Sequence, residues 1–410
     1  SLRSHSTQGA NMNRFKNLYL EIPNVTQYYL ISFFVNCWFM AGNFYYFFTT
    51  IATPKEITMA SGLGIIAMII FEIPTGLLAD KIGNKKVILI GTFACATTSF
   101  IWAMSQNYKW LLICEISYAF GAACISGAME SEVYESIKRS AKYNLEKVFL
   151  KVLSIGNALI YFAAVFAGLV GAALFSITAR LPFTAMGMTL LLAFIVAFKI
   201  KDFKVKESNV PFMPKELLGI FNKKVAYLIP VLFLSLGAAY AIEWGPLFPA
   251  TLKRVGYSGE FASIYNALSA LIVALIIWQI PKFITKIGYK NSILATSLFF
   301  VSGLLSSATT TKAGVLVAIV SMFSITIYLT ILTSHINNIY EGDLRATLNS
   351  TISFIPRMFI GMTSPLLGSF LNENKFSEIY LFASLIVGIG TISTLILWPK
   401  TRNLIRAAQD

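Results

Sequence analysis

The chain has 410 residues, of which 56% are hydrophobic and 13% are charged, and its mean hydropathy is +0.68. A soluble globular protein carries about 25% charged residues, so the composition excludes that class and indicates a surface that faces lipid. The net charge of +14 also fits nucleic-acid binding, and the positions of the basic residues decide between the two interpretations.

A transmembrane helix needs about 20 predominantly apolar residues, and the sequence contains twelve such runs. Their centres lie near Phe39, Ile66, Thr97, Ala122, Phe162, Leu190, Gly237, Leu271, Phe300, Ile325, Phe359 and Val387. We therefore predict an all-α membrane protein with 12 transmembrane helices and with both termini on one side of the bilayer.

The basic residues are distributed unevenly between the predicted loops. If the termini are cytoplasmic, 25 of the 33 Lys and Arg lie on the cytoplasmic side, seven lie outside, and Arg357 lies within the membrane. Such an excess is the usual orientation signal of membrane proteins. We predict a multi-pass protein with cytoplasmic termini that is surrounded by the lipid bilayer and binds no nucleic acid.

The first predicted helix, about residues 27–51, carries two amides. Asn36 and Asn43 are seven residues apart and so share nearly one face of a continuous α-helix. Buried amides in a bilayer need hydrogen-bond partners, and residues of this kind usually face the interior of the helical bundle. We expect both to line a substrate cavity.

The second helix carries Glu72 beside Pro74, well inside the hydrocarbon region. An ionisable side chain at that depth is costly and is a functional-site hypothesis by default. The alternative is a structural glutamate at the proline kink, or one that pairs with helix 11. Glu72 is our first candidate for a proton-coupling residue.

The segment 71–86, FEIPTGLLADKIGNKK, joins the second and third helices. It resembles the G-x-L-A-D-[RK]-x-G-[RK]-[RK] loop of the major facilitator superfamily, with Asn84 in place of the usual basic residue, and FEIPTG resembles a subset of bacterial members. The matching residues that we expect to control conformation are Gly76, Asp80, Lys81, Gly83 and Lys85.

The resemblance implies two pseudo-symmetric six-helix bundles that expose a central cavity to each side in turn. It also implies a bacterial cytoplasmic (inner) membrane. In the outward-facing state, the Asp80 turn would dock on helix 11 near residues 347–350. An aspartate beside a helix N-terminus is favoured by about 0.3–1 kcal/mol.

Helix 4 is the most acidic predicted span. It carries Glu115 in its outer half and Glu130 and Glu132 near its inner end. The segment 126–138, SGAMESEVYESIK, resembles the family pattern SGxxEAxxYDSLK, in which the position of Glu132 is usually apolar. Glu130 and Glu115 are further candidates for proton coupling. Glu132 either lines the cavity or faces cytoplasmic water.

The second half of the chain repeats the first. The segment 81–89, KIGNKKVIL, aligns with 286–294, KIGYKNSIL, at an offset of 205 residues, which indicates a duplicated bundle. We expect a cytoplasmic tail at 1–25, of which 1–11 suggest an addition to the native chain, an N-terminal bundle at 26–199, a cytoplasmic linker at 200–223, a C-terminal bundle at 224–398 and a cytoplasmic tail at 399–410.

Two charged residues of the second half are singled out. Glu243 and Trp244 precede Gly245-Pro246, where helix 7 could break and present a carboxylate to the substrate cavity; the alternative is a place at the outer interface. Arg357 in helix 11 lies at membrane depth, where an unpaired guanidinium is expensive. We expect a carboxylate partner, first Glu72 and second Glu130.

The sequence has no G-x-x-x-x-G-K-[ST], H-E-x-x-H or G-x-S-x-G motif, so we predict neither an enzyme nor a site for a cofactor or metal. An ion gradient is then the expected energy source. The lead function is proton-coupled antiport that exports a cationic or amphipathic small molecule, with Na⁺ as the alternative ion. The second hypothesis is proton-coupled uptake of a small metabolite or a siderophore-like chelate. We expect a monomer.

Overall fold

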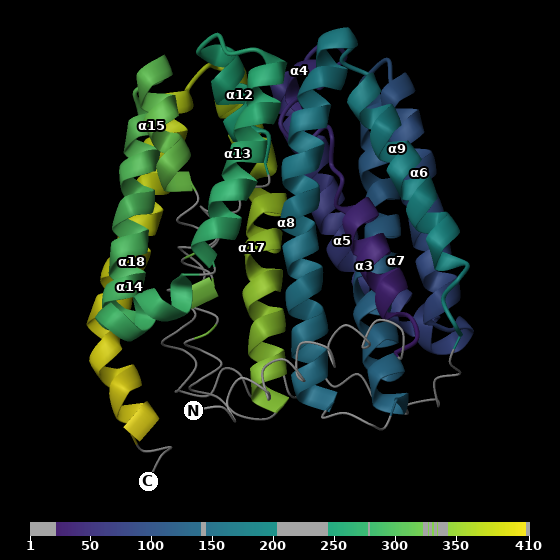
Figure 1. The fold of residues 1–410 in the computed structure, drawn as a ribbon. Coiled ribbons are helices and arrows are strands. Elements are labelled where there is room, and N and C mark those ends of the chain that lie inside the picture. Colours follow the sequence, from purple (N-terminus) through teal and green to yellow (C-terminus); the bar gives the residue numbers. More distant parts are fainter. Residues whose placement is uncertain are drawn as a thin grey trace, which may run out of the picture.

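The computed structural model describes residues 22–140, 145–202, 245–277, 279–322, 327, 330–331, 334 and 343–406. Within these ranges all regular secondary structure is helical. The helices stand roughly side by side as two groups, with the N-terminal half on one side of the molecule and the C-terminal half on the other (Figure 1).

The N-terminal bundle consists of helices α3 to α9. Their bounds are α3 Val25–Val35, α4 Phe44–Phe48, α5 Pro54–Ile82, α6 Asn84–Met104, α7 Tyr108–Arg139, α8 Leu145–Ile177 and α9 Leu181–Ala197. Its core contains large side chains with under 2% exposure, including Phe48, Leu111 and Phe183.

The described part of the C-terminal bundle consists of helices α12 to α18. Their bounds are α12 Leu247–Arg254, α13 Gly259–Ile277, α14 Ile280–Ala308, α15 Lys312–Met322, α17 Asp343–Asn372 and α18 Phe376–Arg406. Two of the predicted span centres, Gly237 and Ile325, lie outside the described residues.

Seven of the described helices are long and apolar enough to cross a membrane. Many large apolar side chains on them are exposed, such as Met104 at 71% and Met362 at 71%. A soluble protein rarely exposes large contiguous apolar surface, so these side chains are placed to contact lipid. This agrees with the predicted all-α membrane fold.

Helix starts follow local sequence signals. Thr53 caps α5, where its hydroxyl accepts from the backbone of Glu56 and the Glu56 carboxylate accepts from the Thr53 N–H, a capping box. Pro54 occupies the first position of the helix, where the missing N–H costs nothing. Asn107 caps α7 in a similar way through its side-chain oxygen.

The internal repeat is present in the backbone. Gly83, between α5 and α6, has φ 90° and ψ 149°, and Gly288, within α14, has φ 78° and ψ 161°. Positive φ is strained for residues with a Cβ atom, so the two glycines of the repeat serve the same turn. The predicted offset of 205 residues therefore relates equivalent places in the two bundles.

The first transmembrane segment departs from the prediction of one continuous helix over 27–51. α3 ends at Val35 and α4 begins at Phe44, and the backbone between them forms turns. We call residues 36–43 the helix 1 break. A helix can be interrupted at membrane depth only where protein or water satisfies the freed backbone groups, and contacts described below supply that protein environment.

The two bundles meet along α5 with α17 and along α8 with α13. We call the end of the molecule that holds α4 and α12 the α4 end, and the opposite end the Gly83 end (Figure 1). Close contacts cluster toward the α4 end: a Cβ on Gly62 would lie 2.2 Å from the Ser364 hydroxyl, and a Cβ on Gly168 would lie 2.7 Å from the Ala267 methyl. Toward the Gly83 end, Ile73 and Leu77 of α5 are 52% and 58% exposed.

Candidate functional site

An ion pair joins the two bundles. The Arg357 guanidinium on α17 donates a hydrogen bond from Nη1 to Oε1 of Glu72 on α5, at 2.6 Å. The side chains of Arg357 and Glu72 are 25% and 39% exposed, respectively. The pair therefore lies at the bundle interface and is only partly buried. The sequence predicted a carboxylate partner for Arg357, with Glu72 first, and this pair is present. Its role in transport stays a prediction.

The depth of the pair follows from helix geometry. Glu72 precedes the last residue of α5, Ile82, by ten positions, which corresponds to about 15 Å along an α-helix. Charge-assisted hydrogen bonds of this kind are about twice as strong as neutral ones. Of the described hydrogen bonds between the two bundles, this one lies nearest the Gly83 end. A change in its protonation would act directly on the contact between the two halves.

The residues that lead into the Gly83 turn have open space beside them. Asp80 is exposed, and no described residue lies within 4 Å of a Cβ placed on Gly76. No ion pair among the described residues involves Asp80, Lys81 or Lys85. Residues 347–350 belong to α17, but their side chains lie outside the description, so docking of Asp80 there stays a prediction.

Acidic side chains follow one face of α7. Glu115 and Glu130 are 15 residues apart and therefore within about 60° of each other around the axis, with Ser126 between them. Oε2 of Glu115 lies 2.9 Å from where a Cβ on Gly64 would stand, so the missing side chain of Gly64 makes room for it. Neither glutamate has a hydrogen bond or ion pair to the described residues. This face carries two carboxyl groups without a described counter-charge.

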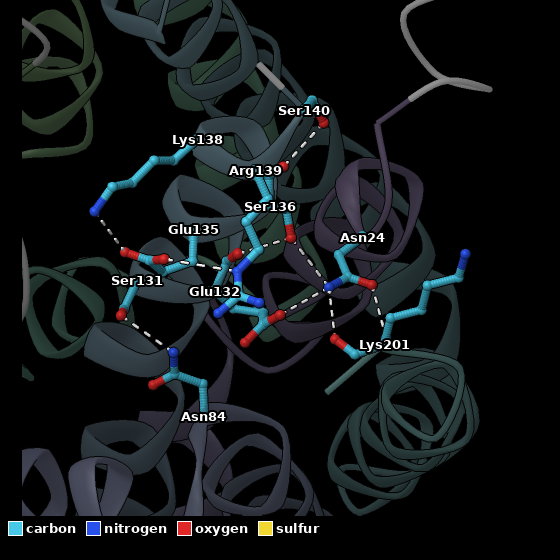
Figure 2. Close-up of polar contacts among 10 residues, drawn as sticks. All are labelled: Asn24, Asn84, Ser131, Glu132, Glu135, Ser136, Lys138, Arg139, Ser140 and Lys201. Atoms are coloured by element: carbon cyan, nitrogen blue, oxygen red, sulfur yellow. Dashed lines mark hydrogen bonds and ion pairs between the residues drawn. The ribbon is translucent and has the colours of Figure 1, made fainter. Parts of the chain in front are cut away.

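Glu132 is buried in the N-terminal bundle, so in this conformation it neither lines a substrate cavity nor faces cytoplasmic water, and both expectations for it are wrong. Its side chain is 3% exposed and accepts a 2.7 Å hydrogen bond at Oε1 from Nδ2 of Asn24 (Figure 2). The same Asn24 nitrogen also reaches the hydroxyl of Ser136 at 3.1 Å. The sequence showed only that this position is usually apolar in the family pattern, and it gave no sign of the buried amide partner.

Asn24 is the residue that sequence reasoning missed. Its amide bonds the backbone of Lys201 in both directions: Nδ2 donates to the carbonyl at 3.0 Å, and Oδ1 accepts from the N–H at 2.8 Å (Figure 2). Asn24 adopts φ 66°, a conformation in which Asn is enriched among non-glycine residues. The side chain thereby fastens the chain after α9 to the start of α3 and to α7.

The two amides of the first helix have different surroundings. Asn36 is partly exposed and donates to the Ser32 carbonyl at 2.8 Å, within its own helix. Asn43 has 0% exposure and donates to the Ser263 hydroxyl on α13 at 2.7 Å. Because both amides lie in the helix 1 break, their spacing does not set a shared face. Asn43 does not line a cavity in this conformation, which corrects that expectation.

Two of the predicted cavity candidates precede α12 in the sequence. Glu243 and Trp244 are outside the described residues. Pro246 is the N-cap residue of α12, and a break of helix 7 before it stays a prediction.

The sequence model of the Major Facilitator Superfamily matches residues 24–359. The chain belongs to this superfamily. It is a membrane transporter and not an enzyme.

Relatives with curated names are distant but extensive. An MFS-type transporter of Methanocaldococcus jannaschii, named as uncharacterized, is 23% identical over 82% of this chain and 88% of its own length. The quinolone resistance protein NorA of Staphylococcus aureus is 25% identical over 70% of this chain and 75% of its own. The multidrug resistance protein MdtL of Shewanella oneidensis is 23% identical over 64% and 66%.

Solved structures share the fold of this superfamily member. The nucleoside transporter NupG aligns with a TM-score of 0.73 and 16% identity over 91% of this chain and 98% of that one. A bacterial homologue of the lysosomal transporter Spinster, in an inward-facing and occupied conformation, aligns with a TM-score of 0.68 and 15% identity over 91% and 95%.

Proposed function

We propose that this protein is a proton-coupled antiporter that exports cationic or amphipathic small molecules across the bacterial inner membrane. The observation that carries the proposal is the Glu72–Arg357 pair, because it places one titratable carboxylate at the contact between the two bundles. The working unit in this proposal is a single chain with cytoplasmic termini.

The orientation in this proposal follows from the basic residues of the Gly83 turn. Lys81, Lys85 and Lys86 would lie in the cytoplasm because Lys and Arg accumulate in short cytoplasmic loops. The Gly83 end is then the cytoplasmic end and the α4 end faces outward. A protein whose bundles touch toward the α4 end would have its cavity open to the cytoplasm.

The coupling step is a competition for Glu72. In the state described here the Glu72 carboxylate accepts from Arg357. A proton that arrives on Glu72 removes its charge, and the charge-assisted bond between the bundles becomes a weaker neutral one. Because the described arrangement opens toward the cytoplasm, that proton has to enter from outside while the cavity faces outward. Return of the bundles to the described arrangement and release of the proton to the cytoplasm then restore the pair. Each charge moved through 100 mV supplies about 2.3 kcal/mol.

The preference for cations rests on the acidic face of α7. Glu115 and Glu130 have no described basic partner, and Phe71 of α5 packs edge to face with Phe120 of α7 at 5.4 Å between ring centroids. Aromatic faces and carboxylates both attract organic cations. The names of two relatives, a quinolone resistance protein and a multidrug resistance protein, support export of such compounds.

The second candidate is proton-coupled uptake. Arg357 is 25% exposed and would bind an anionic group of a substrate once Glu72 is protonated. Structural neighbours include a nucleoside transporter and a D-xylose-proton symporter. Na⁺ in place of the proton is a variant of either scheme.

The test uses purified protein in liposomes with an imposed pH gradient and a pH-sensitive dye inside. Addition of an organic cation should dissipate the gradient, whereas anionic solutes should not. Glu72→Gln should abolish gradient-driven transport and spare exchange of labelled for unlabelled substrate. Glu260→Gln removes a carboxylate from α13 that is not part of the pair and should behave as wild type. Driven transport that survives Glu72→Gln would refute the coupling scheme, and proton flux with anionic solutes only would favour uptake.

A further inference from the structure

The helix 1 break is buried although its backbone is irregular. Cys37, Phe39 and Met40 are 0%, 4% and 6% exposed. Their segment bonds through tight turns, with the Trp38 N–H on the Asn36 carbonyl at 2.9 Å and the Phe39 N–H on the Cys37 carbonyl at 3.1 Å. An unwound segment at membrane depth persists only when its surroundings hold it, so the neighbouring helices must define this one.

Two glycines bring those helices into backbone contact with the helix 1 break. A Cβ on Gly171 of α8 would lie 2.1 Å from the Phe39 carbonyl oxygen, and a Cβ on Gly42 would lie 2.4 Å from the Ala262 carbonyl oxygen of α13. Real Cβ atoms do not approach so closely. The break is therefore wedged between α8 of the N-terminal bundle and α13 of the C-terminal bundle.

Asn43 is the polar centre of this wedge. Its Nδ2 donates to the Ser263 hydroxyl at 2.7 Å and has two longer contacts, to the Phe39 carbonyl at 3.3 Å and the Gly171 carbonyl at 3.5 Å. Its Oδ1 is buried and has no hydrogen-bond partner among the residues that the structure describes. The Ser263 hydroxyl donates to the Gly259 carbonyl at 3.1 Å, so it serves Asn43 as an acceptor.

We infer that Asn43 is a gating residue whose amide sets how readily the bundles separate at the α4 end. The inference rests on the alternating access of the proposed function. With the bundles together, Nδ2 is satisfied across the interface while Oδ1 is desolvated without compensation, which is unfavourable. Separation of α13 would break the first contact and let water reach the second atom. One side chain thus both holds the contact and limits its stability.

Other contacts at the α4 end are less able to set this balance. The Tyr46 hydroxyl donates to the Tyr257 carbonyl at 2.9 Å, and the Lys253 ammonium donates to the Thr49 hydroxyl, but these side chains are partly or fully exposed. Exposed polar contacts contribute little because water replaces them. The buried Asn43–Ser263 contact is the one whose loss has no such replacement.

The experiment measures the separation of the bundles at the α4 end. Spin labels attached through Ser176→Cys on α8 and Ala313→Cys on α15 occupy exposed positions, and the four native cysteines are buried. Electron–electron resonance then gives the ratio of separated to joined molecules, without and with a pH gradient. The wild-type protein should show both populations.

Two variants should shift this ratio in opposite directions. Ser263→Ala leaves the Asn43 amide without its short acceptor and should raise the separated fraction on the order of tenfold. Asn43→Leu removes the unpartnered oxygen together with the amide and should lower that fraction by about the same factor. In the double variant Ser263→Ala should lose its effect, because apolar groups then face each other across the interface.

Ser99→Ala is the matched control, since Ser99 is equally buried and, among the described residues, bonds only the Cys95 carbonyl of its own helix. It should leave the ratio unchanged. If Ser263→Ala fails to raise the separated fraction, or Asn43→Leu raises it, the role of Asn43 is refuted, whereas proton-coupled antiport is not. A single population in the wild type under every condition would overturn alternating access itself and the inference with it.

Discussion

Asn84 and Tyr289 stand 205 residues apart in the chain, directly after the two positive-φ glycines, and each bonds a serine of its own bundle. Asn84 Nδ2 donates to the Ser131 hydroxyl at 3.1 Å, and the hydroxyls of Tyr289 and Ser334 lie 3.1 Å apart. An amide in one half and a phenol in the other thus make equivalent contacts. The duplication has kept the geometry of this turn while its chemistry has diverged.

The two glycine turns make a matched pair for mutation. Gly83→Ala and Gly288→Ala should each destabilise the protein by about 1–2 kcal/mol, because both positions have positive φ. Gly83→Ala should cost more, since its Cβ would lie 3.3 Å from Oδ1 of Asp202, whereas no described atom lies within 4 Å at Gly288. Thermal unfolding in detergent measures the difference. Equal stability of both variants and wild type would contradict the common turn.

The Glu72–Arg357 pair predicts an asymmetric response to loss of either partner. Arg357→Gln leaves a carboxylate that can neutralise itself by taking a proton, whereas Glu72→Gln leaves a guanidinium that stays charged. Glu72→Gln should therefore be the more destabilising, by about 1–2 kcal/mol, which is below the 3–5 kcal/mol of a sealed pair because these side chains are 25% and 39% exposed.

The double variant Glu72→Gln/Arg357→Gln supplies the control for that comparison. Two neutral amides leave no charge at depth, so the double variant should recover most of the stability lost in Glu72→Gln. Thermal unfolding of all four proteins in one detergent completes the cycle. A double variant that loses the sum of both single effects would show that the two side chains do not interact.

Composition and charge were sufficient to predict the helices and the ion pair. Most of the predicted span centres fall inside the described helices, because runs of about 20 apolar residues have few other structural solutions. Arg357 at membrane depth required a carboxylate, and few carboxylates were placed to reach it, so Glu72 followed. The repeat was readable because Gly83 and Gly288 both need a conformation that other residues rarely adopt.

The features that were not predicted depend on contacts between distant residues. Asn24 bonds Lys201, which is 177 positions further along the chain, and no local sequence pattern indicates that contact. The helix 1 break was not predicted for the same reason. Residues 36–43 are apolar enough for a helix, and they unwind because of the contacts of Phe39 with Gly171 and of Gly42 with Ala262. Glu132 was misplaced because its buried partner was unknown.

Substitutions of Asn24 separate its backbone role from its side-chain role. Asn24→Gly keeps the positive φ and loses the bonds to Glu132 and Lys201, whereas Asn24→Ala also strains the backbone. Asn24→Ala should therefore be less stable than Asn24→Gly by about 1 kcal/mol. Asn24→Asp should be worse than Asn24→Gly at neutral pH because it sets a second carboxylate against Glu132.

Removing the repulsion that Asn24→Asp creates with Glu132 tests the contact between Asn24 and Glu132. Adding Glu132→Gln to Asn24→Asp removes one charge and supplies an amide donor, so stability should rise above that of Asn24→Asp alone. The midpoint of thermal unfolding reports each step. If Glu132→Gln is as harmful in the Asn24→Asp background as in the wild type, the buried bond at 2.7 Å does not contribute as described.

The packing of Gly171 against the helix 1 break gives the largest expected effect. A methyl group at Gly171 would meet the Phe39 carbonyl oxygen at 2.1 Å, and neither backbone can yield without moving α8 or the break. Gly171→Ala should therefore destabilise by about 2 kcal/mol or more, in the range of overpacked cores.

Gly388→Ala is the control in another membrane helix, because nothing described lies within 4 Å of its Cβ position. There alanine should stabilise the helix by about 0.5–1 kcal/mol. Unfolding midpoints that move the same way for both variants would show that helix propensity, and not contact with Phe39, governs Gly171.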